Sequence, residues 1–323
     1  MALLVVNQHD VEELLDMEGC IGAMEDALAS LARGELHLPL RMVVRPSGRD
    51  DLLGVMPSHR GGQAPAYGLK TVAVFPDNSR RGLDPHQGTV TLYDGETGEA
   101  RAVMNASAIT AIRTAACSAL ATRLLAREDA RVVGMIGAGH QAKAHLEAMR
   151  TIGNFDEIRI ASRNPDHAEA LAAQAPNANA VATAEDAVRG ADVVVTVTSS
   201  PEPVVKREWL GAGAHVNAVG ACFPHTRELD TATVAASAFF VDRRESAENE
   251  AGDYLIPLRE GAVGPDHIRA ELGEVLVGAK PGRTSDHELT VFESLGLAVE
   301  DLFAAEYVAR RARESGRGTE LEF

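Results

Sequence analysis

Cysteine is scarce in this chain, and metal-binding patterns are missing. Its three cysteines, Cys20, Cys117 and Cys222, are far apart and odd in number. This spacing excludes a disulfide framework and fits reduced thiols in a cytoplasm. The eleven histidines form no H-x-x-x-H pair, and no C-x-x-C occurs. The sequence therefore predicts neither a zinc site nor a metal enzyme.

The chain also lacks an excess of basic residues. The 31 Lys and Arg residues are outnumbered by 47 Asp and Glu, which gives a formal net charge of −16. Because binding to phosphate backbones requires a basic face, no nucleic-acid partner is expected. No apolar run reaches the length of a membrane span, so no membrane partner is expected either. The N-terminus has no basic region ahead of its apolar residues, which predicts a cytoplasmic protein without a signal peptide.

Aromatic residues make up only 4% of the chain, whereas hydrophobic residues make up 45%. Sizeable cores are therefore possible, and they must be built from Ala, Val, Leu and Ile. A length of 323 residues is too long for one ordinary domain and suits two.

The first third of the chain shows the pattern of a largely antiparallel sheet with two leading helices. The helices are expected at residues 11–15 and 19–31. A turn at 94–98 joins two strands as a hairpin, and 78–85 is expected to be a polar loop. Strands are expected at residues 3–6, 41–45, 51–56, 67–75, 88–93 and 100–104.

The middle of the chain alternates strands with helices, which predicts a parallel, doubly wound α/β sheet. A long Ala-rich helix over 106–127 leads into it, and a last helix over 297–311 is expected to return to the first domain. The strands are expected at residues 132–136, 157–161, 180–183, 192–198, 214–219 and 238–241. The helices between them are expected at residues 141–149, 165–174 and 185–189.

A glycine motif follows the first strand of this alternating region. The apolar run 132–136 leads directly into Gly137-Ala138-Gly139, and Ala142 stands at the third small position of G-x-G-x-x-G/A. Glycine permits the tight turn and lets a pyrophosphate approach the backbone, while the helix N-terminus offers free N–H groups. The motif predicts a dinucleotide site, and a glycine turn without a ligand is the alternative.

The end of the second strand of this region bears on the choice of cofactor. An NAD-type Rossmann domain places an Asp or Glu there, but this chain has Ser162-Arg163-Asn164. Arg163 would attract a 2′-phosphate that a carboxylate would repel. We therefore favour NADP(H) over NAD(H), with Arg163 as an ordinary surface residue being the alternative.

Three cations lie in apolar surroundings, namely Arg41, Lys70 and Arg113. Lys70 is inside an apolar strand, where a lysine is costly unless an anion or acceptor meets it. Arg113 lies in the otherwise uncharged run I-T-A-I-R-T-A-A. The three are candidates to converge on a substrate carboxylate. Alternatively, Lys70 extends to solvent along its stem, and the arginines form structural ion pairs. We interpret Arg45, Arg49 and His59 as surface residues.

The segment 216–230 follows a strand at the carboxyl edge of the expected sheet, where ligands bind in such folds. It contains Cys222, which is a candidate nucleophile. No histidine is placed by the sequence to activate this thiol, so a core thiol is the favoured interpretation.

Taken together, these segments resemble the ornithine cyclodeaminase/mu-crystallin family, over nearly the whole chain. The matching segments are G-L-K at 68–70, F-P-D-N at 75–78, I-T-A-I-R-T-A-A at 109–116, G-A-G-H-Q-A at 137–142, V-N-A-V-G-A at 216–221, G-E-V at 273–275 and S-L-G-L-A-V-E-D at 294–301.

The resemblance implies a homodimer. Each subunit is expected to have a substrate-binding and dimerisation domain at 1–118, completed by 300–323, and a Rossmann domain at 119–299. Arg41, Lys70 and Arg113 would hold the substrate carboxylate, with Arg45 as the alternative to Arg41, and Lys70 and Arg113 would act in catalysis. With the glycine motif included, cofactor contacts are expected at His86, Arg113, Gly137, Gly139, His140, Gln141, Ser162, Arg163, Asn164, Thr196, Val219 and Ser294.

One departure from the family pattern bears on the reaction. The cyclodeaminases have a catalytic Asp where this chain has Cys222, and a thiol with a pKa of about 8.5 is a poor substitute. Hydride transfer does not need that Asp. The favoured function is therefore NAD(P)H-dependent reduction of an imine with an α-carboxylate, or the reverse oxidation of an amino acid. The alternatives are an ornithine or lysine cyclodeaminase with bound NAD, and a non-catalytic NADPH-binding protein.

Overall fold

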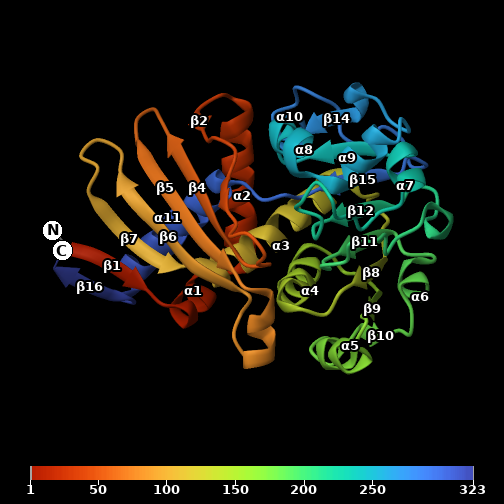
Figure 1. Cartoon of the computed structure of the whole chain (residues 1–323), viewed down its shortest axis with the longest axis horizontal. Coiled ribbons are helices and arrows are strands. Elements are labelled where there is room, and N and C mark those ends of the chain that lie inside the picture. Colours follow the sequence, from red (N-terminus) through yellow and green to blue (C-terminus); the bar gives the residue numbers. More distant parts are fainter. Residues whose placement is uncertain (1, 323) are drawn as a thin grey trace. The chain divides into compact units, whose positions relative to one another are not determined.

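The computed structural model describes residues 2–322. The chain divides into two compact units, Met1–Ala116 with Gly296–Phe323, and Cys117–Leu295. Each unit is built around one eight-stranded sheet (Figure 1). The assignment of substrate binding and dimerisation to the first unit and of the cofactor to the second stays a prediction.

The first unit contains a mostly antiparallel sheet of order β16-β1-β7-β6-β5-β4-β2, with β3 pairing to β4. Only β1 and β7 are parallel to each other. The chain's two terminal strands, β1 and β16, pair side by side (Figure 1). The strands are β1 Ala2–Val6, β2 Leu36–His37, β3 Met42–Val44, β4 Leu52–Arg60, β5 Ala66–Val74, β6 His86–Asp94, β7 Ala100–Asn105 and β16 Thr319–Glu322.

Helices cover one face of this sheet. α11 packs against β4, β5 and β6, and α2 packs against α11. The Asn7 side chain caps α1 by accepting from the Asp10 N–H. The helices are α1 Gln8–Leu14, α2 Met17–Ala32, the first half of α3 Ala106–Leu125, and α11 Ala298–Ser315. A 3-10 turn, η1 Pro76–Arg81, occupies part of the expected polar loop.

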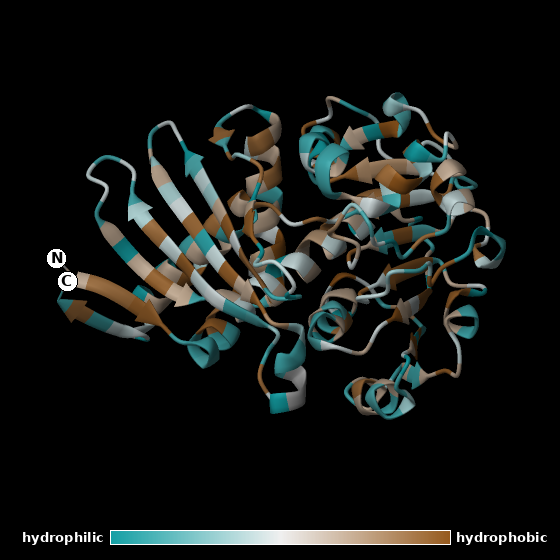
Figure 2. Cartoon of the chain, in the orientation of Figure 1, coloured by the Kyte–Doolittle hydropathy of each residue, from teal (hydrophilic) through white to brown (hydrophobic). Residues whose placement is uncertain are grey.

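Burial alternates along the long strands, as expected of a sheet with one covered face. Along β5, Ala66, Gly68 and Lys70 are buried, whereas Tyr67 is 47% exposed. Figure 2 shows hydrophobic and hydrophilic residues mixed along β4 to β6, so the exposed face of the sheet also carries apolar residues, such as Leu53 at 41%. The covered face is the one toward α11, because the buried Ser58 on β4 donates to the Ala298 carbonyl oxygen at 3.1 Å. Lys70 therefore points into the core of the first unit.

The second unit contains an all-parallel sheet of order β10-β9-β8-β11-β12-β15-β13-β14. The order reverses between β8 and β11, which is the switch point where dinucleotides bind in such sheets. The strands are β8 Val132–Ile136, β9 Glu157–Ala161, β10 Ala178–Ala180, β11 Val193–Thr196, β12 His215–Ala218, β13 Ala238–Val241, β14 Ile268–Glu271 and β15 Thr290–Glu293.

Helices and short turns connect these parallel strands (Figure 1). They are the second half of α3, α4 His140–Ile152, α5 Pro165–Ala172, α6 Ala184–Val188, η2 Arg207–Trp209, α7 Thr231–Ala235, α8 Arg244–Glu250, α9 Gly252–Arg259, η3 Pro265–His267 and α10 Leu272–Leu276. The doubly wound parallel sheet that the sequence predicted is thus confirmed.

Six of the eight strands of this sheet were expected, and β14 and β15 were not foreseen. Each has four residues, of which only two are apolar, and so gives no clear pattern. The third strand was expected at 180–183 but is β10, Ala178–Ala180, because the Thr183 side chain caps α6 instead.

α3 is the one described helix that is long and apolar enough to cross a membrane by length and composition. However, 78% of that stretch is buried inside the protein, as in a core helix. Across residues 2–322, no group of three His, Cys, Asp or Glu side chains is placed to hold a metal ion.

Candidate active site

The first unit brings the three predicted cations together around the start of α11. Lys70, on β5, is 3% exposed, and its Nζ lies 2.6 Å from Oδ2 of Asp301. Arg113, on α3, is 4% exposed, and its Nε donates to the other carboxylate oxygen of Asp301 at 3.1 Å. One buried carboxylate therefore bridges the two cations.

A second carboxylate completes the pairing of Arg113. Its Nη1 donates at 2.8 Å to Oε2 of Glu300, which is fully buried. Glu300 and Asp301 lie in the first turn of α11, where the helix dipole favours negative charge. We name the cluster of Arg41, Lys70, Arg113, Glu300 and Asp301 the cation cluster.

Gly296 joins Arg41 to this cluster. The Arg41 guanidinium is half-buried, and its Nη2 donates to the Gly296 carbonyl oxygen at 3.2 Å. A Cβ at Gly296 would lie 2.3 Å from Nη1 of Arg113, and the backbone φ of +77° is also one that favours glycine. Glycine at this position therefore lets the backbone pass between the two arginines.

Burial changes the acid–base properties of Lys70. Desolvation lowers its pKa to about 8, against the raising effect of the Asp301 carboxylate, and the nearby Arg113 and Arg41 charges lower it further. An ammonium with this pKa holds a proton at neutral pH and is able to release it. The alternative that Lys70 reaches solvent is wrong, whereas the ion pairs considered for Arg113 are present.

Other predicted residues of the first unit lie outside the cation cluster. His86 is exposed at the start of β6, where its backbone N–H donates to Asp84 at 2.8 Å. Arg45 and Arg49 are exposed, as expected. His59 is instead half-buried, with its ring 4.5 Å from that of Tyr67, because β4 extends beyond the expected strand as far as Arg60.

The glycine motif of the second unit has the geometry that a dinucleotide requires. Gly137 follows β8 with a φ of +116°, and a Cβ there would lie 2.6 Å from the Val197 carbonyl oxygen. A Cβ at Gly139, by contrast, would meet no protein atom within 4 Å, so the space beside it is open. His140 and Gln141 form the first turn of α4, whose N-terminal N–H groups suit a pyrophosphate.

The remaining cofactor candidates lie at the carboxyl ends of the strands. Thr196 ends β11, Val219 follows β12, and Ser294 follows β15; all three are buried. In the described part of the chain, the buried side-chain oxygens without a hydrogen-bond partner include the Ser294 hydroxyl and Oε1 of Gln141. Buried polar atoms usually have partners, so these two atoms fit a site that is completed by a polar ligand.

The end of β9 carries no carboxylate. Ser162 Oγ accepts from the Asn164 N–H at 3.3 Å, and Asn164 in turn caps α5. Arg163 between them is exposed. Cys222 lies on the loop after β12 and donates weakly to the Val219 carbonyl oxygen at 3.4 Å.

Three buried carboxylates were not predicted from the sequence. Glu300 and Asp301 stand in the family segment at 294–301 without an expected role, and Glu228 is fully buried outside every expected site. A signal was available for the first pair. Buried cations require buried anions, and an acidic pair opening an apolar helix is a candidate for them.

The chain was compared with known proteins. Residues 1–316 match the model of the ornithine cyclodeaminase/mu-crystallin family. The ketimine reductase mu-crystallin of Mus musculus is 40% identical over 292 residues, which are 89% of this chain and 90% of that protein.

Two solved structures are similar over their whole length. The Delta(1)-pyrroline-2-carboxylate reductase of Thermococcus litoralis, in complex with NADH and L-proline, has a TM-score of 0.94 and 36% identity, covering 98% of this chain and 100% of that one. An archaeal alanine dehydrogenase dimer with bound NAD has a TM-score of 0.94 and 34% identity, and each chain is covered completely. The chain described here belongs to the ornithine cyclodeaminase/mu-crystallin family.

Proposed function

We propose that this chain reduces an imine bearing an α-carboxylate to the corresponding amino acid, or catalyses the reverse oxidation. The reductases and the dehydrogenase among its relatives confirm the predicted class, an NAD(P)-dependent oxidoreductase acting on CH–NH or CH–NH2 groups. The observation that carries the substrate assignment is the buried cation cluster. Its test is NAD(P)H oxidation with cyclic ketimine acids, and with keto acids plus ammonia or methylamine.

The charge of the cluster supports a carboxylate as its ligand. Three cations and two carboxylates leave one net positive charge. A single substrate carboxylate would neutralise that charge, and a guanidinium group binds a carboxylate through charge-assisted hydrogen bonds. Arg41, the least buried of the three cations, is the donor that an entering substrate can reach.

The cluster also supports the protonation step. A protonated imine accepts hydride more readily than a neutral one, and the bound dinucleotide supplies the hydride. We assign Lys70 as the proton donor, because its pKa of about 8 lies near neutral pH. Asp301 holds the Lys70 ammonium in place by direct contact.

This assignment predicts a pH dependence. Lys70 must be protonated to attract the carboxylate and to donate a proton. We therefore expect kcat/KM for imine reduction to be constant below the Lys70 pKa of about 8 and to fall as the pH rises through it. Profiles of kcat/KM from pH 6 to 10 measure this decrease. The residual activity of Lys70→Met should not decrease over the same pH range, and a decrease that persists in this variant would contradict the assignment.

The cofactor preference follows from the end of β9. Ser162 and Arg163 stand where a carboxylate would otherwise hold the ribose, so we propose NADP(H), although the solved relatives contain NADH and NAD. We expect NADPH to bind more tightly than NADH, and Arg163→Ser to lower NADPH affinity about tenfold without changing NADH affinity. Parallel fluorescence titrations measure both affinities. Equal losses for the two cofactors would contradict the role of Arg163.

Two other functions make different predictions. An ornithine or lysine cyclodeaminase would release ammonia without net oxidation of NAD(P)H. The half-buried Cys222 at the family's Asp position does not favour it. A non-catalytic dinucleotide-binding protein would bind NADPH and turn over no imine. The buried cation set around Lys70 and Asp301 favours an enzyme over this alternative.

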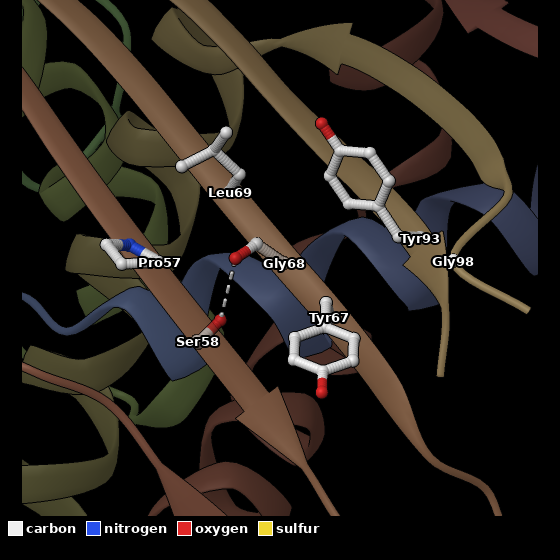
Figure 3. Close-up of a pocket in the computed structure, with 7 residues that line it drawn as sticks. All are labelled: Pro57, Ser58, Tyr67, Gly68, Leu69, Tyr93 and Gly98. Carbon is white, nitrogen blue, oxygen red and sulfur yellow. Dashed lines mark hydrogen bonds between the residues drawn. The ribbon is translucent and has the colours of Figure 1, made fainter. Parts of the chain in front are cut away.

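We also propose a homodimer that is formed through the open face of the first sheet. That face carries exposed apolar side chains, among them Met42 at 63%, Val44 at 52% and Tyr67 at 47%. It also holds a hollow of about 300 Å³, lined by Pro57, Ser58, Tyr67, Gly68, Leu69, Tyr93 and Gly98 (Figure 3). Exposed apolar surface of this kind marks an interface.

The predicted cytoplasmic location stays a prediction.

A further inference from the structure

One fully buried carboxylate in the second unit connects the ends of two neighbouring strands. Oε1 of Glu228 accepts from the backbone N–H of Thr198 at 2.7 Å and from its hydroxyl at 2.6 Å. Oε2 accepts from the backbone N–H of Gly220 at 2.7 Å. Thr198 lies just after β11, and Gly220 lies just after β12. Glu228 therefore fixes the positions of two loops relative to each other.

The three donors require an ionised carboxylate. Two backbone N–H groups and one hydroxyl approach opposite oxygens of Glu228, and a carboxylate accepts at both. A glutamine of the same shape accepts only at one end, so its NH2 group would face a backbone N–H. The arrangement is thus specific for charge as well as for shape.

The backbone of the segment that carries Glu228 is fixed by a second buried carboxylate. Oδ1 of the buried Asp253 accepts from the backbone N–H of Glu228 at 3.0 Å and from that of Leu229 at 2.7 Å. Burial raises the pKa of Glu228, which the Thr198 and Gly220 donors oppose. Keeping an anion at this place is costly, which indicates that its position serves a purpose beyond packing.

The location of the two loops indicates that purpose. A Rossmann sheet binds one mononucleotide on each side of its switch point, with the pyrophosphate between them. Here α4 and the end of β9 lie on the adenosine side, whereas β11 and β12 lie on the other side. We propose that Glu228 is a positioning residue that sets the loops after β11 and β12 for the nicotinamide half of the dinucleotide. This inference rests on the proposed function.

The test compares the whole dinucleotide with its adenosine half. Affinities of wild type and Glu228→Gln are measured by calorimetry for NADPH and 2′-phospho-ADP-ribose, and for NADH and ADP-ribose. We expect the variant to bind the dinucleotides about tenfold more weakly and the ribose fragments as tightly as wild type does. Thr198→Val, which removes one donor and keeps both carboxylate oxygens, should show a smaller loss with the same selectivity.

Glu288→Gln is the matched control. Glu288 also accepts from a backbone N–H, that of Thr284 at 2.8 Å, and from an arginine. It precedes β15 and so lies at the amino ends of the strands, away from the loops after β11 and β12. The Glu288→Gln variant should leave all four affinities unchanged. Equal weakening of dinucleotides and fragments in Glu228→Gln, or no weakening at all, would overturn the inference while leaving the proposed function standing. A wild type that binds neither cofactor would overturn both.

Discussion

Replacing Lys70 by methionine is expected to lower kcat/KM for imine reduction about 10³-fold, with the affinity for the dinucleotide unchanged. Two effects add. The variant loses a charge-assisted contact to the substrate carboxylate, and it loses a general acid, which is typically worth about 10² to 10⁴ in rate. Steady-state kinetics together with a direct titration of the cofactor measure the two quantities separately.

The fold should tolerate this replacement. Lys70 is buried at a desolvation cost, which is the main reason for its lowered pKa, and Asp301 keeps its contact with Arg113 in the variant. Lys280→Met, at an exposed position, is the control and should leave kcat/KM unchanged. A Lys70→Met enzyme with wild-type kcat/KM would remove Lys70 from the mechanism.

Replacing Arg113 by leucine is expected to lower the free energy of unfolding by about 3–5 kcal/mol, because it leaves buried carboxylates without their main counter-charge. Glu300 is fully buried against Arg113, whereas Asp301 still has Lys70. The double variant Arg113→Leu/Glu300→Gln should therefore recover part of the loss. Urea unfolding of both variants and of wild type measures the difference.

An exposed ion pair on α11, the helix that carries Glu300 and Asp301, provides the control. Arg310 and Glu314 of α11 lie 3.5 Å apart with both side chains more than half exposed. Arg310→Leu should change the free energy of unfolding by less than about 1 kcal/mol, because solvent screens such pairs. If Arg113→Leu were no more destabilising than Arg310→Leu, the stability of the fold would not depend on the buried ion pairs of the cation cluster.

Local patterns predicted much of this molecule. The apolar run before Gly137 and the alternation of strands and helices predicted the parallel sheet, and charges in apolar surroundings identified Lys70 and Arg113. These signals are local in the sequence. Each rests on a cost that is felt within a few residues, such as burying a cation or turning the chain tightly.

The parts that the patterns missed depend on contacts between distant residues. Arg113 meets Glu300 and Asp301 across 187 and 188 residues, and Glu228 reaches Thr198 across 30. Nothing near Glu228 in the sequence distinguishes it from a surface glutamate. The strand β15 is likewise recognisable only from its place between β12 and β13, since its own four residues carry too little pattern.

A matched pair of substrates tests the central claim most directly, namely that the buried cation cluster selects an imine with an α-carboxylate. NADPH and NADH oxidation is followed with a cyclic ketimine acid and with the carboxamide of the same ring. We expect turnover of the acid, and a kcat/KM for the amide that is lower by about 10² or more, since the amide offers no charge to the cluster. Equal rates for acid and amide, or no turnover of any ketimine acid with either cofactor, would contradict the account.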